Sequence, residues 1–259
     1  MTLSKLTFCP LGAIFDVDDT LLDNYAGHLG KNLHEHARLL AVREIGQKYR
    51  ISGLVEVSDE QNKAAISRAS EHSIEGSVWQ LMYEVGLVDS PAVDHDNALL
   101  KEIAARKREL YEPVLREFGA PLPRALEFVK AMYVLTDSKI AIASGADKHN
   151  VQAFLQTSGM STVFEERRVI ARQDFVRAKP DPESFEMAFQ TLALADSDRG
   201  RVLAFEDDPK GVAAAKRAGL YVCAITSRFS EAELMKAEIV PDMVHGSYAD
   251  FADSLGIVL

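Results

Sequence analysis

Two aspartates, Asp16 and Asp18, stand two residues apart directly after the apolar run 13–15. This run reads as the end of a buried strand, because it is too short for a helix and turn-forming residues follow it. Successive strand residues point to opposite faces, so Asp16 and Asp18 project the same way if the extended geometry continues. Two carboxylates facing one crevice suit a metal site, or a nucleophile beside a general acid. A solvated acidic turn is the alternative for this stretch taken alone.

Three later segments repeat the layout of an apolar run or rigid loop that delivers polar side chains. The largely apolar run 139–143 leads to Ser144 and Gly145, and the run 201–205 leads to Glu206 and Asp207. Between them, Lys179 lies in a Pro-rich loop. In an open parallel sheet, ligands bind beyond the carboxyl ends of the strands. A hydroxyl, a lysine and two acidic clusters at such positions predict a site for a phosphoryl group and a metal ion.

With these residues the chain resembles the haloacid dehalogenase superfamily, and in particular its phosphatases and phosphomutases. The motifs that carry the resemblance occur in the expected order: Asp16-x-Asp18-x-Thr20, Ser144, Lys179-Pro180, Glu206-Asp207, and the helix-like stretch 211–219. The resemblance covers the first twenty or so residues and nearly everything from Pro121 onward. It implies an α/β fold, with a doubly wound parallel sheet of Rossmann type and an inserted all-helical cap.

The pattern along the chain supports this organisation. After Asp23, apolar residues recur at three- and four-residue spacing and predict helices over 34–49, 64–73, 77–85 and 97–118. Strand–helix alternation resumes after Pro123 and predicts strands near 139–143, 168–171, 202–206, 221–226 and 243–245. We therefore expect a core made of residues 1–22 and 120–259, and a helical cap made of residues 23–119.

Phosphoryl transfer needs an in-line nucleophile, neutralisation of charge on the phosphoryl oxygens and help for the leaving group. Asp16 would be the nucleophile, forming an aspartyl-phosphate, and would also bind Mg²⁺. Asp18 would protonate the leaving oxygen and then activate the water that attacks the intermediate. By resemblance, the backbone carbonyl of Asp18 is a further metal ligand. Lys179 would neutralise Asp16 and the phosphoryl group, although a surface lysine is the plain alternative.

Asp207 would complete the metal site, with Glu206 beside it. A cap on the helix that starts near Lys210 is the alternative for Asp207, and the role we favour for Asp208. Ser144, with the backbone N–H groups that follow it from Gly145 onward, would hold a phosphoryl oxygen; Ser144 could instead be an N-cap.

The cap carries fewer signals for substrate choice. His28 follows Asp16 by twelve residues and could hydrogen-bond Asp18 or the substrate, but a helix-surface histidine is the alternative. Lys107 resembles a residue on the last cap helix that reaches towards the substrate, against the alternative of a solvated basic face. His34 and His36 are expected to be exposed, because no Cys or carboxylate spacing around them resembles a zinc site.

Composition limits the class of partner. The chain has 259 residues, of which 47% are hydrophobic and 26% charged, as in ordinary globular proteins. Its 29 basic and 39 acidic residues give a net charge of −10, which argues against nucleic acid or an anionic membrane as a partner. No apolar stretch approaches the roughly 18–20 residues of a membrane span. We expect a cytoplasmic protein whose partner is a small phosphorylated metabolite; the sequence does not indicate its oligomeric state.

The leading expectation is a Mg²⁺-dependent phosphatase for a small metabolite, such as a sugar phosphate. The alternative enzyme is a sugar phosphomutase similar to β-phosphoglucomutase. Asp147 disfavours it, because a basic residue three positions after Ser144 would suit a second phosphate better. A non-catalytic binding protein on the same fold is the alternative from another class, but every expected catalytic position is filled here.

Overall fold

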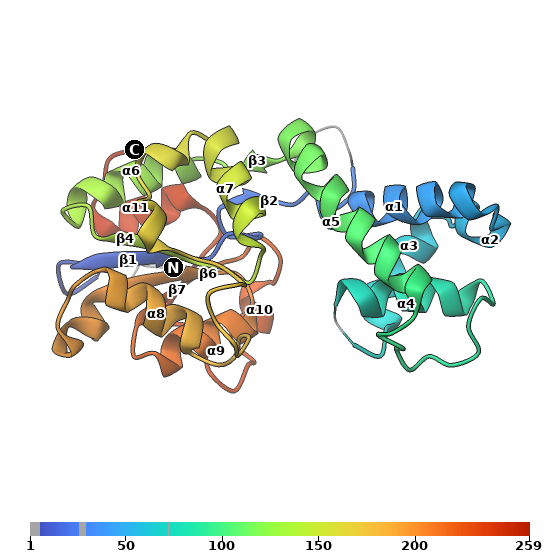
Figure 1. The fold of residues 1–259 in the computed structure, drawn as a ribbon. Helices are drawn as coiled ribbons and strands as arrows, with labels where there is room; N and C mark the ends of the chain where they lie inside the picture. Colours follow the sequence, from blue (N-terminus) through green and yellow to red (C-terminus); the bar gives the residue numbers. More distant parts are fainter. Residues whose placement is uncertain (1–5, 26–29, 72) are drawn as a thin grey trace. The chain divides into compact units, whose positions relative to one another are not determined.

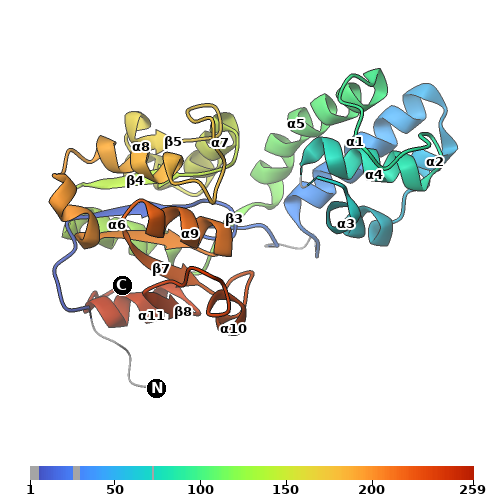
Figure 2. The ribbon, with the colours of Figure 1, turned by 90° about the horizontal axis from the view of Figure 1, so that it is seen from below.

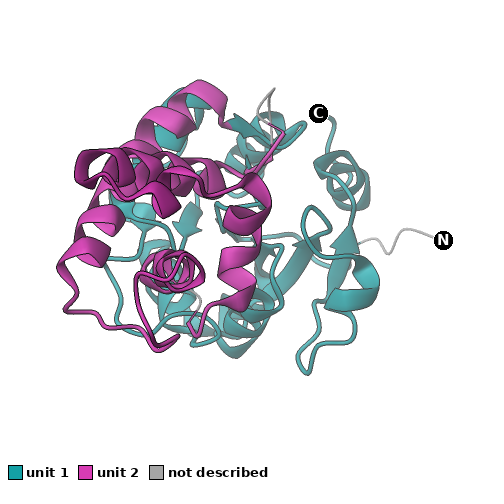
Figure 3. Ribbon diagram, turned by 90° about the vertical axis from the view of Figure 1, so that its right-hand side faces the viewer, with its two compact units in different colours: residues 1–23, 120–259 teal, residues 24–119 magenta. Residues whose placement is uncertain are grey.

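The computed structural model describes residues 6–25, 30–71 and 73–259. The chain forms two compact units, which Figure 3 colours separately. One consists of Met1–Asp23 and Ala120–Leu259, and we call it the core unit; the other is Asn24–Gly119, and we call it the helical unit. Each unit is described by itself below.

The core unit contains a six-stranded sheet with the order β5-β4-β1-β6-β7-β8, in which all paired strands are parallel. Its strands are β1 (Gly12–Phe15), β4 (Ile140–Ala143), β5 (Val169–Ile170), β6 (Val202–Glu206), β7 (Tyr221–Ile225) and β8 (Met243–His245). β1 lies inside the sheet, with β4 on one side and β6 on the other. This confirms the predicted doubly wound parallel sheet.

Helices cover both faces of this sheet (Figures 1 and 2). The helices of the core unit are α6 (Ala125–Leu135), α7 (Lys148–Thr157), α8 (Glu183–Thr191), α9 (Pro209–Arg217), α10 (Glu231–Leu234) and α11 (Tyr248–Leu255). In Figure 1, α6 and α11 lie above the sheet, while α8 and α9 lie below it. Short 3₁₀ turns occur at η1 (Met160–Thr162), η2 (Glu166–Arg168) and η3 (Asp196–Arg201). The connections between consecutive parallel strands cross one face or the other of the sheet, as parallel pairing requires.

The two faces of the sheet have different cores. On one face, Phe15 stacks on Phe205 with ring centroids 4.7 Å apart, and Phe128 of α6 meets Phe205 edge-on at 5.2 Å. On the other face, Ile14 belongs to a separate hydrophobic core with Val212 of α9. Side chains alternate along a strand, so the residue that follows Phe15 and the residue that follows Phe205 return to the second face. Those residues are the acidic candidates of the site.

A small antiparallel pair of strands, which we did not predict from the sequence, links the two segments that connect the units. β2 (Leu22–Asp23) pairs with β3 (Ala120–Pro121). Each strand has two residues, so neither produces a periodic pattern in the sequence. The pair brings together the two points at which the chain leaves and re-enters the core unit.

The described part of the helical unit contains helices and no strand. They are α1 (Leu33–Tyr49), α2 (Ser52–Val55), α3 (Asp59–Arg68), α4 (Ile74–Glu84) and α5 (Ala98–Phe118). The one-turn helix α2 lies between the helices predicted over 34–49 and 64–73, and belongs to neither. Polar N-caps begin the longer helices, such as Ser58 with its capping box and Asn97. No helix in the described ranges is long and apolar enough to cross a membrane.

Candidate active site

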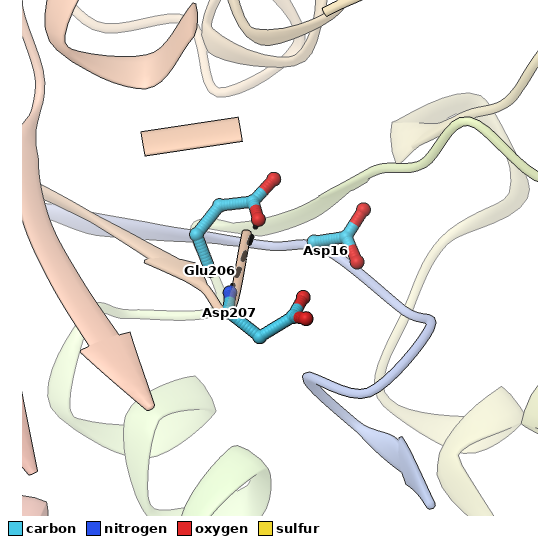
Figure 4. Close-up of side chains that lie close together, drawn as sticks. All are labelled: Asp16, Glu206 and Asp207. Carbon is cyan, nitrogen blue, oxygen red and sulfur yellow. Dashed lines mark hydrogen bonds between the residues drawn. The ribbon is translucent and has the colours of Figure 1, made fainter. Parts of the chain in front are cut away.

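Three acidic side chains gather where two neighbouring strands end (Figure 4). Asp16 directly follows β1, Glu206 is the last residue of β6, and Asp207 comes next. Phe15 is the register partner of Phe205, so Asp16 and Glu206 are brought to the same level of the sheet. One carboxylate oxygen from each of the three residues lies within 4.8 Å of the others, and all three residues are buried. The strand ends thus bring three carboxyl groups together in the interior of the protein.

Lys179 supplies the positive charge in this cluster. Its Nζ donates to Asp16 Oδ1 at 2.6 Å, to Glu206 Oε1 at 2.6 Å and to the carbonyl of Ala143 at 3.0 Å. Burial lowers the pKa of Lys179, but Asp16 and Glu206 more than offset this, so the pKa ends above its ordinary value. Lys179 is therefore held in its charged form beside the expected nucleophile, rather than on the surface.

Asp16 remains difficult to ionise despite this lysine. Burial is the largest cause that raises its pKa well above the ordinary value, and Glu206 and Asp18 raise it further, against the lowering by Lys179. Asp18 is itself half-buried and is close enough to Asp16 to act on its charge. The structure thus brings Asp18 near Asp16, as the two-residue spacing suggests, but Asp18 does not belong to the buried trio.

Glu206 uses both of its oxygens within the protein. Oε1 accepts from Lys179, and Oε2 accepts from the backbone N–H groups of Asp207 at 3.1 Å and Asp208 at 3.3 Å. Glu206 therefore fixes both the turn after β6 and the ammonium group of Lys179. A metal ion that contacts Glu206 would have to share these oxygens, so its expected role as a direct ligand stays a prediction.

The surroundings of Asp207 indicate whether a cation fits among the three carboxyl groups. Its Oδ1 accepts from Thr20 Oγ1 at 3.1 Å, whereas its Oδ2 is buried and meets no hydrogen-bond donor among the described residues. Burial first, and then Glu206, Asp16 and Asp19, raise the pKa of Asp207 to about 9. A buried orphan oxygen between two other carboxylates is a costly arrangement without a counter-charge. The donors are all hard oxygens, so the cluster fits Mg²⁺ or a similar divalent cation.

Asp207→Asn is expected to stabilise the metal-free protein. The pKa of Asp207 rises from 3.8 to about 9 on folding, so its stabilising contribution is complete below pH 3.8 and is lost towards pH 9. An uncharged amide avoids this loss and can donate to a neighbouring carboxylate. At pH 8 in a chelator, we expect the free energy of unfolding to increase by roughly 1–2 kcal/mol, a gain that shrinks towards pH 4.

Urea unfolding at both pH values measures this effect, and Asp208→Asn is the matched control. Asp208 caps α9 by accepting from the N–H of Lys210 at 2.7 Å, a role that asparagine can also fill. With Mg²⁺ present the order should reverse, because only the wild type gains from the ion. A lower stability of Asp207→Asn at pH 8 without metal would contradict the electrostatic account.

The loop that carries Asp18 and Thr20 is anchored from the far end of the chain. Tyr248 Oη donates to the carbonyl of Thr20 at 2.9 Å, and Ser227 Oγ donates to the carbonyl of Asp19. Asp19 has a φ of 56°, a left-handed conformation that Asp tolerates better than most side chains. Sequence reasoning missed both anchors, since neither residue belongs to a motif. Thr20 is the last residue of the first motif, and its bond to Asp207 makes it a support of the site.

Ser144 lies on the other side of β1, at the end of β4. It is buried, its N–H donates to Ile170 O at 2.9 Å, and its Oγ accepts from Ala146 N–H at 3.1 Å. As far as the described residues show, this leaves the hydroxyl hydrogen of Ser144 available to a phosphoryl oxygen. Gly145 is exposed, and a Cβ added there would meet no atom within 4 Å. The placement of both residues is compatible with their expected roles.

Gly211 is a residue that sequence reasoning treated only as part of a helix. A Cβ at this position would lie 2.0 Å from Glu206 Cδ, because α9 passes directly against that carboxylate. The sequence signal is a glycine in the first turn of a helix that follows an acidic pair. Only the absence of a side chain lets Glu206 reach both Lys179 and the turn.

Gly211→Ala is therefore expected to displace Glu206 and, with it, Lys179. We expect activity to fall by about 100-fold or more, since small displacements of positioning groups have effects of this size. Gly200→Ala is the matched control: it makes the same change at an exposed position outside the site, with open space around it. Steady-state kinetics with a phosphate ester measures both. Equal losses in the two variants would show that the contact with Glu206 is not the cause.

The remaining candidates belong to the helical unit. His28 lies outside the described residues. Lys107 is buried, with 5% of its surface exposed; its Nζ lies 3.0 Å from His34 Nδ1 and 4.7 Å from the centroid of the Tyr111 ring. The alternative of a solvated basic face for Lys107 is therefore wrong. The expected exposure of His34 is also wrong, because its ring stacks on Tyr111 with centroids 4.2 Å apart.

Known proteins resemble this chain over most of its length. A family model described as haloacid dehalogenase-like hydrolase matches residues 11–219. A validoxylamine A 7'-phosphate phosphatase from Streptomyces hygroscopicus subsp. limoneus is 26% identical over 233 residues, which cover 88% of this chain and 91% of that protein. The range of the family model includes Asp16, Ser144, Lys179 and the acidic pair at 206–207.

Solved structures show the same fold at lower identity. One is a predicted phosphoglycolate phosphatase from Haemophilus somnus (TM-score 0.69, 16% identity, 96% of this chain and 99% of that chain). Another is a putative β-phosphoglucomutase from Thermotoga maritima (TM-score 0.66, 21% identity, 96% of this chain and 99% of that chain). The predicted enzyme class, a phosphoric monoester hydrolase of this type, agrees with the family match and with the named phosphatase relative. The chain belongs to the haloacid dehalogenase-like hydrolase family.

Proposed function

We propose that this protein is a Mg²⁺-dependent phosphatase that hydrolyses a small phosphorylated metabolite through an aspartyl-phosphate on Asp16. The observation that carries the proposal is the buried trio Asp16, Glu206 and Asp207, in which Lys179 contacts Asp16 and one oxygen of Asp207 has no donor among the described residues. Such a cluster is suited to holding a divalent cation and a phosphoryl group together.

In this mechanism an Asp16 oxygen attacks phosphorus while the ester oxygen leaves with a proton from Asp18. The Asp18 carboxylate then takes a proton from water, the water oxygen attacks phosphorus, and Asp16 is released as a carboxylate. Lys179 neutralises charge next to Asp16, and Ser144 donates its hydroxyl hydrogen to a phosphoryl oxygen. Asp16, Asp207 and the backbone carbonyl of Asp18 would hold Mg²⁺, with Glu206 beside them. The bound ion would offset the repulsion between the Asp16 carboxylate and the phosphate dianion.

The comparison that covers most of both chains supports a phosphatase. The Streptomyces hygroscopicus relative is named for removing a phosphate from validoxylamine A 7'-phosphate, and we extend the reaction type, not that substrate, to this chain. A sugar phosphate is the substrate class we favour. The cytoplasmic location remains a prediction.

A mutase similar to β-phosphoglucomutase is the second candidate, because one structural neighbour carries that name. Asp147 opposes it. This residue is the N-cap of α7, three residues after Ser144, and its Oδ1 accepts from Gln173 Nε2 at 2.7 Å. A second phosphate beside the Ser144 loop would therefore face a carboxylate that is fixed in place. Like charges at short distance disfavour binding, so the phosphatase is the better reading.

Phosphate release tests the proposal. The panel consists of sugar and organic-acid phosphates with Mg²⁺, and includes β-glucose 1-phosphate, which is also examined for conversion to glucose 6-phosphate. We expect release from one or a few esters, with loss of the activity in a chelator. Conversion of the isomer without release would establish the mutase. The absence of both reactions across a broad panel would favour a non-catalytic protein on this fold.

Lys107 is proposed to contribute to substrate choice. A lysine that is 5% exposed is retained at a cost in desolvation, and it lies on the last helix of the inserted unit. Lys107→Met should lower kcat/KM for the preferred metabolite by about 10-fold, and for a small aryl phosphate much less. Lys101→Met is the control on an exposed position of the same helix. Equal losses on both substrates would show that Lys107 does not determine substrate specificity.

A further inference from the structure

Gln173, in the segment after β5, contacts the segment after β4 at the start of α7. α7 begins at Lys148, and the side chain of its N-cap residue Asp147 makes no capping hydrogen bond of its own. Instead, Gln173 Oε1 accepts from the N–H of Lys148 at 2.9 Å, and Gln173 Nε2 donates to Asp147 Oδ1 at 2.7 Å. A residue 25 positions away thus caps the helix and fixes the orientation of the cap carboxylate.

Ser144 lies within the same framework. The N–H of Arg172 donates to Ala146 O at 3.0 Å, and the N–H of Ala146 donates to Ser144 Oγ at 3.1 Å. Residues 144–146 read Ser-Gly-Ala, so the loop between Ser144 and Asp147 has no large side chain to anchor it. Its position depends on contacts made by the segment after β5.

A second side-chain link between these segments is long. Lys148 Nζ lies 3.5 Å from Asp174 Oδ1, and both side chains are partly exposed, so water screens the pair. Gln173 is exposed as well, but its two hydrogen bonds are shorter, at 2.9 Å and 2.7 Å, and one of them caps a backbone N–H of the helix. Of these two links, the one through Gln173 has the closer contacts.

We propose that Gln173 is a positioning residue for the phosphate-binding loop 144–147. It keeps Ser144 in place for a phosphoryl oxygen, and it turns the charge of Asp147 towards its own amide. This inference rests on the proposed phosphatase function. Without Gln173, the Asp147 carboxylate loses the amide that fixes its orientation and partly offsets its charge beside the phosphate site, and Ser144 loses support on its helix side.

Gln173→Ala tests the inference. We expect KM for the phosphate ester and the inhibition constant of inorganic phosphate to rise by about 10-fold, with a much smaller change in kcat. Gln173→Glu should raise both constants further, because it keeps the acceptor for Lys148 but places a second carboxylate against Asp147. Gln190→Ala, at an exposed position on α8, is the control and should behave as wild type.

A double variant separates positioning from a general loss of structure. If Asp147 acts by its charge, Asp147→Ala combined with Gln173→Ala should recover most of the affinity for phosphate that Gln173→Ala loses. Losses that merely add in the double variant would overturn the inference, and so would unchanged KM and phosphate inhibition in Gln173→Ala. A wild-type protein that neither hydrolyses phosphate esters nor binds phosphate would instead overturn the proposed function, and this inference with it.

Discussion

Asp16→Asn is expected to abolish turnover and to leave the fold intact. The amide cannot act as a nucleophile at phosphorus, so we expect phosphate release to fall by at least about 10⁴-fold. Its Oδ1 can still accept from Lys179, which donates to Asp16 at 2.6 Å in the wild type. The fold should survive because the substitution also removes one charge from a crowded acidic cluster.

Phosphate release with Mg²⁺, together with thermal unfolding, measures this prediction. Asp137→Asn is the matched control: Asp137 is exposed at a turn with a φ of 50°, a conformation that asparagine also tolerates. It should retain full activity. Residual turnover of Asp16→Asn near the wild-type rate would assign the nucleophile to another group, and a collapse of the fold would show that Asp16 is mainly structural.

Lys179→Ala has the second largest expected effect, because it acts on stability and activity together. Lys179 is the ammonium between Asp16 and Glu206, and both carboxylates are buried. Removing it leaves buried charges uncompensated, which typically costs about 3–5 kcal/mol of folding free energy. Activity should fall by about 100-fold or more, since the charge that offsets the phosphoryl group is lost.

Urea unfolding in a chelator gives the stability change, and Lys210→Ala, at an exposed position of α9, is the control. If Lys179→Ala does not fold, Lys179→Met preserves the stem of the side chain and loses the same charge. Wild-type stability in both variants would contradict the account. Lys179→Ala and Asp207→Asn are expected to change stability in opposite directions, which a purely steric explanation does not predict.

The parts of the site nearest to strand ends could be predicted from sequence. Alternation along β1 and β6 places Phe15 and Phe205 on one face and the following acidic residues on the other, as the patterns near 13–16 and 202–206 indicate. Lys179 was found through its Pro-rich loop, and the structure brings it to 2.6 Å from Asp16. Local pattern and motif order were sufficient there because each strand end carries its own residue.

The supports of the site could not be predicted, because they depend on contacts between distant segments. Tyr248 holds Thr20 across 228 positions, and Gln173 caps α7 from another loop. Gly211 is informative only once α9 is seen against Glu206. The burial of Lys107 likewise follows from packing between α1 and α5, not from the spacing of charges on one helix.

Mapping the phosphorylated residue tests the central claim most directly. The wild-type protein, mixed with its best ester and Mg²⁺ and quenched within a single turnover, should carry one phosphoryl group on the peptide that contains Asp16. The same peptide from Asp16→Asn should be unmodified. Phosphate release without any phosphorylated protein, or a phosphoryl group on a different peptide, would contradict an aspartyl-phosphate at Asp16.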